Sequence, residues 1–170
     1  MIKKSIAILF LLTTGIIIQS CSVKYSFSGA SIPSEMKTVS VEFFPNRALI
    51  INPNLSQQFT EALKEKFRSQ TKLILVTDMG DGNFEGEITG YTTMPMQITG
   101  SEVAAKNRFT ISVKVKYSNA IDPKSNFEKS FSRYDDYDGD QSLTAVEDQL
   151  VKKIIDMLTE DIYNAAFVNW

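Results

Sequence analysis

An acidic run near the C-terminal end of the chain has the residue types that bind calcium. Residues 135–140 read Asp-Asp-Tyr-Asp-Gly-Asp, and a calcium loop needs carboxylates at fixed spacings around an invariant glycine. When Gly139 is aligned with that glycine, Tyr134 takes the first ligand position and Ala145 takes the place of the bidentate glutamate. Two essential ligands are therefore missing. We interpret the run as a solvated acidic loop before the last helix, and we expect no metal or other cofactor.

Composition excludes several other kinds of catalytic or metal site. The 170-residue chain has no histidine and one cysteine, which excludes Ser-His-Asp triads, Cys-His dyads, histidine-based metal sites and internal disulfides. The chain is 43% apolar and 22% charged, which is typical of a globular domain. Its formal charge of −2 argues against nucleic acid as a partner. The sequence therefore indicates a protein that is not an enzyme.

Basic residues share one face of an expected strand. Between Lys106 and Tyr117, apolar side chains alternate with polar ones, which predicts a long strand with a core side and a cationic side. The basic residues on the cationic side are Lys106, Arg108, Lys114 and Lys116. Such a row of charges is suited to bind phosphate groups.

The register of the preceding hairpin accounts for two of these cations. If the chain turns at residues 99–102, Glu85 faces Lys116 and Glu87 faces Lys114, while apolar residues meet on the core side. Cross-strand ion pairs then explain both lysines without any ligand.

The other two cations have no such explanation in this register. Lys106 falls opposite Pro95, and Arg108 falls opposite Thr93, so neither has an acid across the strand. Lys106 and Arg108 are therefore the candidate phosphate ligands. A merely solvated strand face is the alternative.

The N-terminal residues resemble a bacterial lipoprotein signal. Lys3 and Lys4 precede an apolar run over residues 5–18, which is too short for a membrane-spanning helix but fits a secretory signal. An aliphatic residue three positions before Cys21 and a small residue just before it resemble a lipobox. We expect residues 1–20 to be a signal peptide and Cys21 to carry the lipid. The alternative is a buried free cysteine after an ordinary signal peptide.

We expect residues 21–170 to form one domain that is tethered to the outer membrane. Two or more acyl chains anchor a protein stably, at about 0.8 kcal/mol per buried methylene. Ser22 follows the cysteine, where an aspartate would resemble an inner-membrane retention signal. Sorting to the outer membrane is therefore expected.

Hydrophobic periodicity predicts two helices and several strands around one core. One helix follows Asn54, with Gln57 as its capping-box partner, and a longer one spans residues 143–167, with Thr144 and Glu147 as its capping box. Strands are expected at residues 23–28, 39–43, 73–76, 84–91, 106–117 and 126–133. The apolar stripes of the helices are Leu55, Phe59, Ala62, Leu63 and Phe67, and Val146, Leu150, Ile154, Leu158 and Ile162. One-sided helices and strands imply an α+β fold, with two helices packed on one face of a mainly antiparallel or mixed β-sheet in a two-layer sandwich.

The order of several segments resembles a known family. A lipobox cysteine leads into Tyr-Ser-Phe-Ser-Gly-Ala at residues 25–30, and Lys-Thr-Val-Ser-Val-Glu-Phe-Phe-Pro-Asn follows at residues 37–46. The later segments are Phe-Thr-Glu-Ala-Leu at 59–63, Gly-Glu-Ile-Thr-Gly-Tyr at 86–91, the long strand, and Asp-Ile-Tyr-Asn-Ala-Ala-Phe-Val-Asn-Trp at 161–170. Together they resemble the LPS-assembly lipoprotein family (LptE), in its Bacteroidetes form.

The resemblance implies a function in transport and assembly. Members of that family are outer-membrane lipoproteins that sit inside the β-barrel protein of the LPS export complex, plug it, help it assemble and contact LPS. The implied partners are an LptD-type barrel, LPS and the outer membrane, with the domain facing the periplasm or inside the barrel lumen. Cys21 is the position that carries over, and Lys106 and Arg108 become candidate LPS-phosphate contacts. The alternative is an unrelated periplasm-facing lipoprotein that acts as a lipid-binding or envelope-assembly adaptor.

Overall fold

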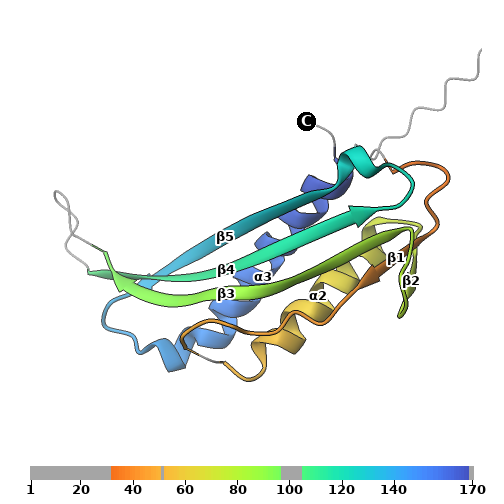
Figure 1. Cartoon of the computed structure of the whole chain (residues 1–170). Coiled ribbons are helices and arrows are strands. Elements are labelled where there is room, and N and C mark those ends of the chain that lie inside the picture. Colours follow the sequence, from red (N-terminus) through yellow and green to blue (C-terminus); the bar gives the residue numbers. More distant parts are fainter. Residues whose placement is uncertain (1–31, 51, 97–104, 169–170) are drawn as a thin grey trace, which may run out of the picture.

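The computed structural model describes residues 32–50, 52–96 and 105–168 (Figure 1). Its elements in chain order are β1 (Thr38–Val41), α2 (Leu55–Gln70), β2 (Ile74–Val76), β3 (Gly82–Pro95), β4 (Lys106–Asn119), the 3-10 helix η1 (Pro123–Ser125), β5 (Phe127–Asp138) and α3 (Leu143–Phe167). Cys21, the strand expected at residues 23–28 and the turn expected at residues 99–102 lie outside the described residues.

Five strands form one mixed sheet, in the order β2-β1-β3-β4-β5. β1 runs parallel to β2 and β3, whereas β3, β4 and β5 pair antiparallel. Both helices lie on the same face of the sheet (Figure 1). The expected α+β fold, with two helices on one face of a mixed sheet, is therefore confirmed.

Helix α2 buries the stripe that the sequence predicted. Leu55, Phe59, Leu63 and Phe67 are fully buried, because 3–4 spacing aligns them on one side of the helix. The helix begins after Asn54, as expected, and the Gln58 amide donates to the Asn54 carbonyl. The Asn54 side chain makes no capping hydrogen bond, so the capping box expected here is absent.

Helix α3 has the predicted bounds, and its stripe also packs on the sheet side. Ile154, Leu158 and Ile162 are fully buried, and Leu150 is nearly so. The capping box expected between Thr144 and Glu147 is wrong, because Ser142 occupies the N-cap position, and the Ser142 side chain makes no capping hydrogen bond.

Glu147 instead joins three parts of the fold. Its carboxylate accepts hydrogen bonds from the Tyr91 hydroxyl of β3 and from Nδ2 of Asn52, the latter at 2.9 Å. Burial, with a smaller contribution from Glu147, raises the pKa of Tyr91 to about 12, so this hydroxyl remains a donor at neutral pH. The contact fixes the first turns of α3 against β3 and the segment before α2.

The expected strand over residues 39–43 is shorter than its alternation suggested. Val39 and Val41 are buried, but β1 ends at Val41, and Phe43 is 61% exposed. Phe44 turns inward instead and is fully buried over Gly86, where a Cβ would lie 2.6 Å from the Phe44 ring. Ser40 is also buried, and its hydroxyl donates to Oδ1 of Asn83 in β3.

The interpretation of the acidic run as a loop is wrong for most of its residues. Strand β5 continues to Asp138 rather than ending at residue 133, and only Gly139 and Asp140 of the run lie in a turn. Strand alternation sends Asp135 toward the helices, where it pairs with Lys153 of α3 at 2.8 Å, and Asp136 toward the other face. Over the described ranges, no group of three or more acidic or cysteine side chains could hold a metal ion.

Candidate binding surface

The sheet face opposite the helices, called the open face below, is polar and is not covered by a helix in the described part of the chain (Figure 1). It arises because the apolar residues of β3 and β4 alternate toward the helices, which leaves their polar neighbours outside. Register and burial assign the following residues to the open face: Glu85, Glu87, Thr92, Met94, Lys106, Arg108, Thr110, Ser112, Lys114, Lys116, Glu128, Ser130, Ser132, Tyr134, Asp136 and Asp138.

The β3–β4 register is confirmed over its first half. Glu85 lies opposite Lys116 and Glu87 lies opposite Lys114, with Phe84 meeting Tyr117 on the core side. The expected ion pair forms between Lys116 Nζ and Glu85 Oε1 at 2.6 Å.

Lys114 forms its ion pair on the other side of β4. Its Nζ lies 2.5 Å from Oε1 of Glu128 in β5, although Glu87 is its direct neighbour in β3. Hydrogen bonding to Lys114 lowers the pKa of Glu128 and raises that of Lys114. Both lysines are therefore paired with acids of this chain.

A β-bulge shifts the second half of the register by one residue. Ile88 pairs with Val113 but Gly90 pairs with Ser112, so that Thr89 is the extra residue of β3. The expected neighbours of the candidate cations are consequently wrong. Pro95 lies opposite Asn107 rather than Lys106.

Arg108 has a partner that the hairpin register did not include. It lies opposite Met94 in β3 and Asp136 in β5. Its Nε and Nη2 donate to the two carboxylate oxygens of Asp136 at 2.8 and 2.9 Å, and its guanidinium stacks 3.6 Å from the centre of the Tyr134 ring. The expectation that Arg108 lacks a compensating acid is therefore wrong.

The side chains of Arg108 and Asp136 are partly exposed, and each shifts the pKa of the other. The two side chains are 31% and 30% exposed. The hydrogen bonds from Arg108 lower the pKa of Asp136, and those to Asp136 raise the pKa of Arg108. The pair joins the central strand β4 to the edge strand β5 on the open face.

Lys106 is the less engaged of the two candidate cations. It is exposed and lies opposite Asp138, at the end of the sheet that also holds Pro95. Within the described residues it forms no ion pair, although its charge contributes to the lowered pKa of Asp136. A further anion would therefore meet an exposed ammonium group at Lys106.

Small polar side chains separate the two charged regions of the open face. The Ser112 and Ser132 hydroxyls hydrogen-bond across β4 and β5 at 2.9 Å, and Thr92 and Thr110 face each other in the next row. The surface is broad and largely self-compensated in charge. Such a surface suits contact with another polar protein surface.

The comparison with family models assigns the chain to a protein family. The model for LptE, described as lipopolysaccharide-assembly, matches residues 36–166, which include every described strand and helix up to the last turn of α3. The chain belongs to the LptE family. This confirms the resemblance to the family seen in the sequence, while its Bacteroidetes form stays a prediction, and it makes the chain an LPS-assembly lipoprotein by family.

Solved structures share the fold of this chain at low sequence identity. A minor lipoprotein from Acinetobacter baumannii is 16% identical with a TM-score of 0.50, and the match covers 76% of this chain and 91% of that one. A hypothetical protein from Chlamydia trachomatis is 14% identical with a TM-score of 0.52, and the match covers 79% of this chain and 99% of that one. At these identities the likeness shows the fold alone. A comparison with curated protein sequences found no match.

Both helices of the described chain are amphipathic rather than apolar all round. Within residues 32–50, 52–96 and 105–168, no helix is long and apolar enough to cross a membrane.

Proposed function

We propose that this LptE-family protein is a non-enzymatic lipoprotein of the outer membrane. In this proposal, residues 1–20 direct export and are removed, and Cys21 carries the acyl chains that tether residues 21–170 to the bilayer. The domain plugs the β-barrel LPS translocon, an LptD-type protein, and helps it to assemble. The family match over residues 36–166 is the observation that carries the proposal.

The open face supports a position inside the lumen of a barrel. The lumen of a large outer-membrane barrel is polar, and a plug must expose a polar surface that does not bind indiscriminately. On the open face, Glu85, Lys116, Arg108 and Asp136 satisfy one another. Such internally paired charges cost less to place against another polar wall than unpaired charges would, because each keeps a partner when it loses solvent.

Contact with LPS is assigned to the end of the open face that carries Lys106 and Arg108. LPS carries phosphate groups, which lysine binds as a point charge and arginine binds through its fork of donors. Lys106 is the principal contact in this proposal, because Arg108 already donates to Asp136. Arg108 retains unused N–H groups and acts as the second contact.

Purification in mild detergent tests the plug. The acylated protein, isolated from its native outer membrane, should come out with a large β-barrel protein that mass spectrometry identifies. A protein that enters the detergent extract without any barrel would contradict the proposal, and would favour an adaptor that works outside the translocon.

A further inference from the structure

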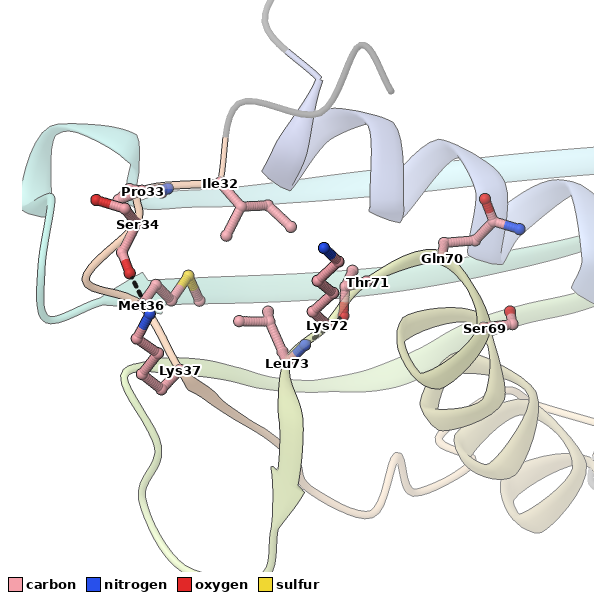
Figure 2. A pocket seen from close by; sticks show the side chains of 10 residues that line it. All are labelled: Ile32, Pro33, Ser34, Met36, Lys37, Ser69, Gln70, Thr71, Lys72 and Leu73. Atoms are coloured by element: carbon pink, nitrogen blue, oxygen red, sulfur yellow. Dashed lines mark hydrogen bonds between the residues drawn. The ribbon is translucent and has the colours of Figure 1, made fainter. Parts of the chain in front are cut away.

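A cavity lies at the end of the sheet where the described chain begins. It has a volume of about 570 Å³, within the usual range of small-molecule sites. One side is formed by Ile32 and the residues that lead into β1, and the other by the segment from the end of α2 to the start of β2 (Figure 2). Its lining residues are Ile32, Pro33, Ser34, Met36, Lys37, Ser69, Gln70, Thr71, Lys72 and Leu73.

The charge of this cavity is one-sided. Lys37 and Lys72 line it, and no acidic residue is among its lining residues. Lys37 Nζ donates to the Ser34 carbonyl, a neutral partner, and Lys72 forms no ion pair within the residues that the structure describes. The nearby carboxylate of Asp81 is occupied by the backbone amides of Lys37 and Thr38. Lys37 is nevertheless close to two carboxylates, because its charge adds to the hydrogen bonds that lower the pKa of Glu35 and of Asp81. Lys72 is thus the cation that lines the cavity without a carboxylate partner among the described residues.

The hydroxyl groups of the cavity serve the end of α2. Thr71 Oγ1 donates to the Phe67 carbonyl at 2.7 Å, and Ser69 Oγ donates to the Lys66 carbonyl at 3.2 Å. These bonds satisfy carbonyl groups that a helix C-terminus would otherwise leave exposed. The lysines and the side-chain amide of Gln70 are therefore the polar groups that remain available to a ligand.

Apolar side chains form the rest of the wall. Ile32, Met36 and Leu73 point toward the same space as Lys72 (Figure 2). Just outside, Ile74 is 65% exposed and is held beside the cavity by the bond from its amide to the Lys37 carbonyl at 2.9 Å. The site thus combines two cations with an apolar wall, which matches a ligand that has a phosphate group next to hydrocarbon.

The place of the cavity relative to the N-terminus indicates the source of such a ligand. Ten residues separate Cys21 from Ile32, and an extended chain of this length reaches at most about 40 Å. If Cys21 is acylated, as the proposed function requires, the cavity cannot move further than this from the leaflet that holds the anchor. Anionic headgroups attract lysines at a membrane surface.

We propose that the cavity lined by Lys37, Lys72, Met36 and Leu73 binds the headgroup of an anionic glycerophospholipid of that leaflet. The lysines contact the phosphate and the apolar wall contacts the first part of the acyl chains. This inference rests on the proposed acylation of Cys21, but it does not depend on the proposal that the domain plugs the β-barrel translocon. Its consequence is a second, non-covalent contact that orients the domain on its tether.

The test measures how fast individual lysines react in membranes of different charge. The acylated full-length mature protein is placed in vesicles of phosphatidylcholine with phosphatidylglycerol, and separately in vesicles of phosphatidylcholine alone. Reductive methylation is followed at each lysine by peptide mass spectrometry. We expect Lys72 to react about fivefold more slowly in the anionic vesicles, as one charge-to-phosphate contact would produce. Lys152, which is exposed on α3 and outside the cavity, is the control and should react equally in both.

A photoactivatable phosphatidylglycerol tests the apolar wall. The probe should label peptides that contain Met36 or Leu73, and Lys72→Glu should lower that labelling severalfold, whereas Lys152→Glu should not. A circular dichroism melt of each variant establishes that it is folded.

Several outcomes would overturn the proposal. Equal reactivity of Lys72 in the two kinds of vesicle would do so. This includes the case in which the chain's own residues before Ile32 protect Lys72 equally in both. Equal protection by inorganic phosphate would assign the cavity to a free anion, and protection by LPS but not by phosphatidylglycerol would assign it to LPS. The intact mass reports acylation separately, so that a failed anchor and an empty cavity are distinguished.

Discussion

The guanidinium of Arg108 holds the carboxylate of Asp136 through two parallel hydrogen bonds of 2.8 and 2.9 Å. The pair crosses from β4 to the edge strand β5, and the Tyr134 ring fixes the plane of the guanidinium from one side. Arg108 is therefore a positioned group rather than a free charge. An anion that approaches this end of the open face first meets Lys106, which has greater freedom.

Charge reversal at Lys106 should weaken LPS binding. Lys106→Glu removes an exposed cation and places a carboxylate near Asp138 and Asp136, so we expect a severalfold lower affinity for purified LPS at low salt. The difference should shrink at high salt, because exposed charges are screened beyond about 10 Å at 0.1 M ionic strength. Titration of LPS against the acylated protein measures the effect.

Lys152→Glu is the matched control, because it makes the same charge change on the exposed side of α3. We expect it to leave LPS affinity unchanged. Equal losses for Lys106→Glu and Lys152→Glu would show that net charge, rather than the open face, governs the interaction.

Truncation of Ile154 should destabilise the domain strongly. Its side chain is fully buried between α3 and the sheet, and large-to-small core substitutions cost about 2–5 kcal/mol. Urea unfolding of Ile154→Ala should show a loss in that range. Lys152→Ala, on the exposed side of the same helix, should stay within about 0.5 kcal/mol of the unchanged protein. A loss for Ile154→Ala below roughly 1 kcal/mol would mean that this stripe faces a partner.

Periodicity predicted the elements with strong one-sided patterns. The core side of β4 and the bounds of α3 follow from apolar spacing, because burial against one layer requires that spacing. The half of the hairpin between Phe84 and Ile88 was predictable for the same reason, since a slip would send its apolar side chains to the open face.

Contacts that join distant parts of the chain were not predictable in this way. The acids of residues 135–138 suggested a solvated loop because acids are depleted in strands, and only the neighbouring β4 makes Asp136 a strand residue. The bulge at Thr89 had one local signal, the isolated Gly90 within a strand pattern. Glu147 has the spacing of a capping box, but Tyr91 and Asn52 reach it from elsewhere in the fold.

The free energy of unfolding of the domain should fall in acid, partly because the Asp81 carboxylate becomes protonated. Its Oδ2 accepts hydrogen bonds from the Lys37 and Thr38 amides and from the Thr38 hydroxyl, and the amide bonds are the main cause of its lowered pKa. A carboxyl group whose pKa is lower in the folded state contributes its full stabilisation above its unfolded pKa, and loses it as the pH falls through its folded pKa. We expect the loss to begin below about pH 4.

Urea unfolding of Asp81→Asn as a function of pH tests this. The variant should be less stable than the unchanged protein at pH 7, and the two should converge in acid. Asp140→Asn, in the exposed turn after β5, serves as the control and should follow the unchanged protein. A constant difference between Asp81→Asn and the unchanged protein across the acid range would contradict the assignment.

Replacement of Cys21 should separate anchoring from folding. Cys21→Ala should give uncleaved or soluble protein, because the acyl chains are lost, while the thermal unfolding of the domain is unchanged. Fractionation and intact mass measure the two effects. Mature protein that begins at Cys21 without acyl chains would refute the anchor.

The most direct test of the plug is the amount of correctly assembled barrel after the protein is depleted. Assembled barrels migrate faster than unfolded ones in a gel without heating, so both forms can be measured in the same membranes, together with LPS at the cell surface. Depletion should lower the assembled form and leave LPS short of the surface, and Lys106→Glu should restore assembly when it replaces the native protein. Normal assembled barrel and normal surface LPS after complete depletion would contradict the plug.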